Sequence, residues 1–175
     1  MNSKILLAFA LATLTSCAST VSRRDPTGET FPRVQGSSLA GTTYTIPDDF
    51  AGSPVVLLLG FVMNAQFDID RWLLGLAQAG LEVRVHEVPT IEGLVPGMFA
   101  GTIDAGMRSG IPQEDWGSVI TVYGDADKIV ALTGNEAPRN GRVLLLDAAG
   151  KIVFFHDRGY SAGSLLRLKD AIQSR

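Results

Sequence analysis

The feature that most limits the fold of this chain is an apolar run, Val55–Phe61, that leads directly into a helical pattern. From Val55 to Leu59 every residue is Val or Leu, so the run is apolar on both faces. Such a strand is typical of the centre of a sheet that is covered on both sides. Helical spacing and a closing glycine follow at Ile69, Trp72, Leu73, Leu76 and Gly80. The junction therefore predicts a buried strand, a short loop and an amphipathic helix, with Asp68 as N-cap and Asp70 in the first turn.

The next segment, Leu81–Val88, alternates between apolar and polar residues and predicts a half-exposed strand. Strand, helix and strand in this order form a right-handed parallel βαβ unit. A turn with Gly150 at positive φ is expected to join a hairpin. The remaining expected elements are strands Thr43–Ile46, Val119–Tyr123, Arg142–Asp147 and Lys151–His156, a helix Asp125–Leu132 and a last helix capped by Ser161. The sequence thus predicts an α/β fold with a central mixed sheet.

Met98–Arg108 is predicted to be a helix, although Gly101 and Gly106 lie within it. Two interpretations are open. The segment could be a mobile lid, or its small residues could let the helix lie close against the sheet, and base rates favour the second.

The N-terminus has the pattern of a secretory signal. Lys4 is followed by an apolar run, Ile5–Leu14, which is too short to span a membrane. The run ends in Leu14-Thr-Ser-Cys17, which resembles the lipobox of bacterial lipoproteins, and this resemblance implies that Cys17 is acylated and becomes the mature N-terminus. The alternative is an ordinary cleaved signal with an incidental cysteine nearby.

This interpretation divides the chain into a signal peptide (1–16), a lipid-anchored flexible tether (17–33) and a folded domain (34–175). Membrane lipid, through palmitate on Cys17, is the expected anchor. Ala18 in place of Asp resembles the Gram-negative sorting signal for the outer membrane, facing the periplasm.

Composition excludes several functions. The net charge is −3 and no basic cluster is larger than Arg23-Arg24, so no nucleic-acid partner is expected. Cys17 is the only cysteine, which excludes an internal disulfide and a cysteine-based zinc site. The sequence contains no phosphate-binding loop and no dinucleotide motif, so we expect neither a cofactor nor a metal ion.

Three stretches resemble the thioredoxin-like superfamily, including its peroxiredoxin-type members. They are Gly36-Ser-Ser-Leu39 with Ile46-Pro47 and the Val55 strand, the hairpin Leu144–Val153, and Ser161-Ala-Gly-Ser-Leu165. Scattered positions are also similar to the Atp10 family of mitochondrial ATP synthase assembly factors: Gln66 ahead of Asp70-Arg71-Trp72, Asn135, Asp147 with Gly150, and Gly159. The resemblance implies a thioredoxin-like three-layer sandwich.

The departures from that family concern its chemistry. Thioredoxins and peroxiredoxins place the attacking cysteine at the strand-to-helix junction, where the helix N-terminus stabilises a thiolate. The matching residues here, Val62–Phe67, include neither Cys nor Ser. The cis-proline that faces this cysteine is also missing, because the chain there reads Asn140-Gly141-Arg142. Thiol redox and peroxide chemistry are therefore not expected, and an enzyme is not the favoured interpretation.

The same junction is the candidate interaction surface. Its residues are Met63, Asn64, Gln66, Asp70 and Arg71, with Phe61 and Phe67 as neighbouring apolar contacts. We expect it to bind a protein of the cell envelope, as an assembly factor or chaperone would. One alternative is an enzyme of the cell envelope that uses His86, Glu87 or Asp70 as acid or base in the same cleft. Another is a purely structural lipoprotein.

Overall fold

The computed structural model describes residues 20–93 and 96–174. The predicted signal peptide and Cys17 lie outside the described residues. No helix within the described ranges is long and apolar enough to cross a membrane.

The main sheet has four strands in the order β4-β3-β6-β7. Their bounds are Val55–Gly60 for β3, Arg84–Pro89 for β4, Arg142–Leu146 for β6 and Ile152–His156 for β7. β3 and β4 are parallel and are joined by α1, Gln66–Gln78, which confirms the βαβ unit. β6 runs antiparallel to β3 and forms the predicted hairpin with β7, with Gly150 at φ 78°.

A second sheet has the order β2-β1-β5, with β1 at Val34–Ser38, β2 at Thr43–Ile46 and β5 at Ile120–Thr121. Parallel bridges from Glu87 to Val119 and from Thr90 to Val122 connect it to the β4 edge of the main sheet. β1 is not predicted from the sequence, because Gly36 and two serines have low strand propensity. Its pairing depends on a close approach, since a Cβ on Gly36 would lie 2.7 Å from Cγ2 of Ile120.

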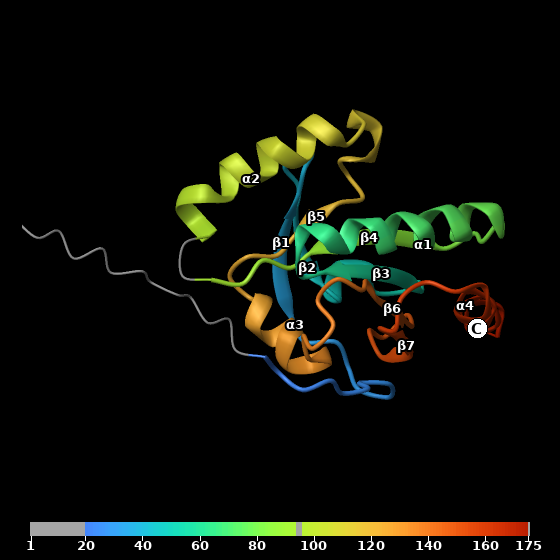
Figure 1. Ribbon diagram of the computed structural model, residues 1–175. Helices are drawn as coiled ribbons and strands as arrows, with labels where there is room; N and C mark the ends of the chain where they lie inside the picture. Colours follow the sequence, from blue (N-terminus) through green and yellow to red (C-terminus); the bar gives the residue numbers. More distant parts are fainter. Residues whose placement is uncertain (1–19, 94–95, 175) are drawn as a thin grey trace, which may run out of the picture.

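Three helices and two apolar clusters complete the layers, and Figure 1 shows the helices around the main sheet. α1 and α4 (Ala162–Gln173) cover one face, where Val56 and Leu58 of β3 point. The other face holds Val55, Leu57 and Leu59 and is covered by α3 (Ala126–Thr133) and the second sheet. β3 is thus buried on both faces, and the three-layer α/β sandwich is confirmed.

α2 extends over Pro96–Gly110 and stands apart from the main sheet in Figure 1. The expectation that its glycines let it lie close against the sheet is wrong, since a Cβ on Gly101 or Gly106 would meet no atom within 4 Å. Side chains hold the helix instead. The Tyr123 hydroxyl donates to Asp104 at 2.7 Å, and Nε of Arg108 donates to the Leu39 carbonyl at 2.8 Å. A lid function for this helix stays a prediction.

The N-terminal segment corrects the predicted solvated tether. Val21 donates its N–H to Oδ1 of Asn135 at 2.7 Å, and its carbonyl accepts from the Asn135 N–H at 3.0 Å. Gly28 donates to the Ile152 carbonyl at 2.8 Å, and Phe31 is buried in the core. The prediction of a solvated tether is therefore wrong for residues 21–33, which pack on the domain. Their polar composition does not predict this packing, because their backbone groups pair with residues more than a hundred positions away.

Candidate functional site

The junction between β3 and α1 exposes an apolar group. A 3-10 turn, Met63–Ala65, precedes the helix, and its Ala65 points into the core. On the outside, Met63 is 92% exposed, Phe67 70% and Val62 43%. Water contact with three large apolar side chains at one site is unfavourable, and such groups mark binding surfaces. We call Val62, Met63 and Phe67 the exposed junction.

The structure places all five predicted surface residues, Met63, Asn64, Gln66, Asp70 and Arg71, on the outside. It brings Gln66 and Asp70 together, because Nε2 of Gln66 donates to Oδ1 of Asp70 at 2.8 Å. The same nitrogen donates at 2.9 Å to Oε2 of Glu87 on β4. A polar group therefore borders the exposed junction. Val62 is not among the predicted surface residues, although it directly follows the apolar run Val55–Phe61, which was the available signal.

Asp68 has a different role from the one predicted. It is not the N-cap, because α1 begins at Gln66 and Asp68 lies buried in the first turn. Its carboxylate accepts backbone N–H groups from Gly141 at 2.9 Å and from Tyr160 at 2.7 Å. Gly141 lies where the family resemblance places a proline, and proline has no N–H to donate. A proline at position 141 could not make the hydrogen bond that Gly141 makes to Asp68 in this chain.

Glu87 is the acid whose pKa the junction changes. Burial raises the pKa of its carboxyl, the hydrogen bond from Gln66 lowers it, and the negative charges of Asp70 and Asp115 raise it further. These groups favour the protonated form relative to an exposed glutamate.

The two histidines have partners elsewhere in the fold. His86 stacks on Phe50 with the ring centroids 4.7 Å apart, and burial lowers the pKa of its imidazole. Nε2 of His156 lies 2.8 Å from the Gly159 carbonyl, and its ring packs edge-on against Trp72. Trp72 is fully buried, as predicted. Both rings thus have packing roles, and Glu87 is the titratable group of β4 that Gln66 links to the junction.

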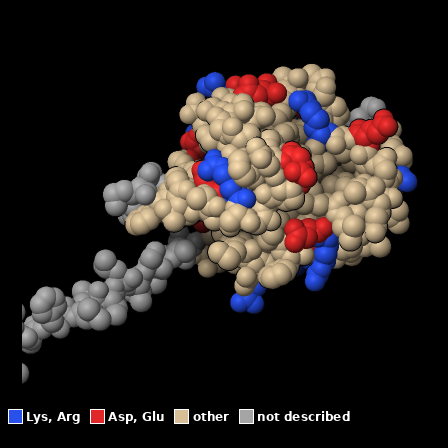
Figure 2. All heavy atoms as spheres, turned by 90° about the horizontal axis from the view of Figure 1, so that it is seen from above, with Lys and Arg blue, Asp and Glu red and all other residues tan. Residues whose placement is uncertain are grey.

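The face of the molecule seen in Figure 2 is mixed in charge. Figure 2 shows acidic and basic side chains in small separate groups within a largely uncharged surface. Within the described ranges, no three His, Cys, Asp or Glu side chains are grouped so that they could hold a metal ion.

No model of a protein family and no curated protein sequence matches the chain. Solved structures do. Yeast Sco1 with copper bound has a TM-score of 0.58 at 13% identity, covering 87% of this chain and 96% of that one. BsSco, a member of the Sco family of cytochrome c oxidase assembly proteins, has a TM-score of 0.57 at 9% identity, covering 89% and 100%. The exposed lipoprotein thioredoxin Etrx1 of Streptococcus pneumoniae has a TM-score of 0.53 at 15% identity, covering 81% and 99%.

These similarities establish the thioredoxin-like fold. At such low identity they carry no activity over to this chain. Function must therefore be inferred from the site itself.

Proposed function

We propose that this chain is a membrane-anchored, non-redox module of thioredoxin-like fold that binds a protein partner in the cell envelope, as an assembly factor does. The observation that carries the proposal is the exposed junction. Three large apolar side chains face water at the position where redox members of the fold hold cysteines. Burying them against a partner would remove apolar surface from water, at about 25 cal/mol per Å².

The neighbouring groups suggest the chemistry of the partner segment. Met63 is flexible and polarizable, so it adapts to apolar side chains of different shape. Asp70 and Glu87 are hydrogen-bond acceptors, and both are held in place by Gln66. We infer that the partner presents apolar side chains and at least one amide or basic donor.

Two of the structural neighbours lend support by analogy of fold. One is a lipoprotein thioredoxin and another belongs to a family of assembly proteins. In this chain the single cysteine is placed in the predicted anchor, which leaves the domain without a thiol for redox work.

Site-specific photocrosslinking in native membranes tests the binding surface. A photoreactive residue at Asn64 should capture a reproducible partner, and a Met63→Asp change in the same chain should abolish the capture because it places a charge in the apolar contact. Leu74 provides the matched control, since it is also exposed on α1 but lies outside the junction. Equal capture from positions 64 and 74 would contradict the proposal.

The anchor needs a separate test. Stable anchoring takes more than one acyl chain, and the lipoprotein pattern supplies this at Cys17. Labelled palmitate should be incorporated into the full chain, and Cys17→Ala should lose both the label and membrane fractionation. Retention of label by the variant would exclude acylation at this residue while leaving the crosslinking result unaffected.

A further inference from the structure

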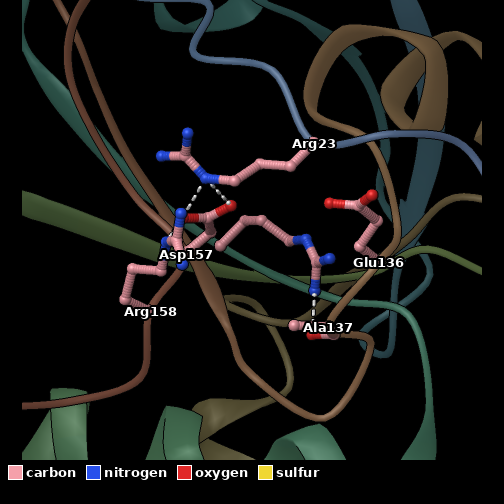
Figure 3. Close-up of a pocket in the computed structure, with 6 residues that line it drawn as sticks. Arg23, Glu136, Ala137, Asp157 and Arg158 are labelled. Carbon is pink, nitrogen blue, oxygen red and sulfur yellow. Dashed lines mark hydrogen bonds and ion pairs between the residues drawn. The ribbon is translucent and has the colours of Figure 1, made fainter.

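A cavity of about 80 Å³ lies beside the loop that precedes β6. It is lined by residues from the N-terminal segment, the loop before β6, the first position of β6 and the two positions after β7: Arg23, Glu136, Ala137, Arg142, Asp157 and Arg158. Figure 3 shows the side chains of Arg23 and Arg158 directed toward Asp157, with Glu136 on the other side of the cavity. We call it the Arg142 cavity.

Arg142 is an unusual residue to find at the start of a central strand. Its side chain is 1% exposed, and its guanidinium lies 4.5 Å above the Phe61 ring. One nitrogen, Nη1, donates to the carbonyls of Ala137 and Asn140, each at 2.8 Å. Nε is buried and has no acceptor among the described residues. A buried guanidinium with unused donors is costly, so an acceptor at this site would stabilise it.

The charges around the cavity do not cancel. Three guanidinium groups face two carboxylates, which leaves an excess of one positive charge. The Asp157 carboxylate already has two ion-pair partners. Nε of Arg23 lies 2.7 Å and Nε of Arg158 3.7 Å from its oxygens. Glu136 is exposed, and its negative charge repels an anion. Burial lowers the pKa of Arg142, and the negative charge of Asp157 offsets part of this effect.

We propose that the Arg142 cavity binds a phosphate group, with Arg142 at its base and Arg23 and Arg158 at its rim. Guanidinium groups match the oxygens of phosphate in geometry and charge. A phosphodiester carries one negative charge, which balances the excess. Arg23 follows Cys17 by only six residues (17 to 23), so a phospholipid headgroup is the favoured source. That choice of source depends on the proposed membrane anchor, whereas phosphate binding itself does not.

Titration calorimetry of the full chain with inorganic phosphate, at constant ionic strength set with sodium chloride, tests the site. Saturable binding is expected. Arg158→Gln should weaken it by about five-fold and Glu136→Gln should strengthen it by a similar factor, since each changes one charge at the rim. Arg142→Gln should abolish it. If that variant does not fold, the two rim variants with opposite expected signs still decide the outcome.

Arg33→Gln is the matched control, because Arg33 is exposed and paired with Asp48 instead of lining the cavity. It should bind phosphate as the unchanged chain does. Absence of saturable binding, or the same affinity in the Arg158, Glu136 and Arg33 variants, would overturn the proposal.

Vesicles distinguish the two sources of phosphate. The Cys17→Ala chain, which lacks the proposed anchor, should cosediment with phosphatidylglycerol vesicles, and a further Arg158→Gln change should weaken this by about five-fold. Phosphate binding without vesicle binding would assign the cavity to free phosphate and overturn the lipid source. If neither phosphate nor vesicles bind, the crosslinking result at Asn64 is not affected. The two proposals can therefore be disproved independently.

Discussion

Two loops meet near the start of α1, and they differ in which side chains are exposed and which are buried around them. The loop before α1 and the first turn of that helix expose Val62, Met63 and Phe67 to water. The loop before β6 takes charged groups inward, so that Asp68 and Arg142 are buried and bonded to backbone atoms of that loop. Apolar exposure and polar burial both cost free energy. The first cost can be recovered by a partner, and the second is offset within the fold.

Between the two loops, the larger expected effect on stability is on the polar side. Asp68→Asn replaces an oxygen that accepts N–H by an amide nitrogen, so either Gly141 or Tyr160 keeps a buried donor without an acceptor. We expect a loss of about 2–3 kcal/mol in the free energy of unfolding, measured with urea. Asp70→Asn on the exposed side should change it by less than about 0.5 kcal/mol. Equal effects would remove the distinction between the loops.

A smaller loss is expected at the N-terminal segment. Arg23→Gln removes the close partner of Asp157, a nearly buried carboxylate, and leaves Arg158 at 3.7 Å. Because Arg23 is itself partly exposed, we expect about 1–2 kcal/mol of destabilisation, less than for a fully buried pair. Urea unfolding measures this, with Arg24→Gln as control on a more exposed pair. No difference between the two variants would mean that the Arg23 contact does not hold the segment.

Glu87→Gln tests the junction through pH. The carboxyl pKa is raised above its ordinary value of 4.5 in the folded chain, so the folded state binds more protons than the unfolded state in the window above 4.5. Stability supplied by Glu87 is therefore lost as pH rises through this window. The glutamine variant should melt at a higher temperature than the unchanged chain at pH 7, and the advantage should vanish below pH 4.5. A lower melting temperature at pH 7 would show that the carboxylate is stabilising there.

The smallest effect on stability is expected at the exposed junction. Phe67→Ser should change the free energy of unfolding by less than about 0.5 kcal/mol, because its ring is already in water. Ile69→Ala, two residues away but buried, should cost about 2–5 kcal/mol. If Phe67→Ser destabilises as much as the core variant, the ring has a structural role, and the binding proposal loses its main support.

Local patterns predicted much of this fold. The apolar run of β3, the Gly150 turn and the N-cap at Ser161, which accepts from the Ser164 N–H at 3.1 Å, all depend on residues close together in the chain. The failures share another property. β1, the docked segment from Val21 and the buried Asp68 each depend on partners from distant parts of the sequence. Composition cannot identify such partners, because the identity of a polar residue does not show whether it bonds to water or to a distant backbone group.

The candidate site divides in the same way. By itself the sequence determined that the junction Val62–Phe67 contains no thiol, that the one cysteine is Cys17, and that a central strand leads into an amphipathic helix. Only the tertiary structure decided that Met63 and Phe67 face water, that Gln66 links Asp70 to Glu87, and that Arg142 lies in a cavity beside Arg23. Residue identity fixes which chemistry is available, whereas exposure and proximity arise from packing between segments far apart in the chain.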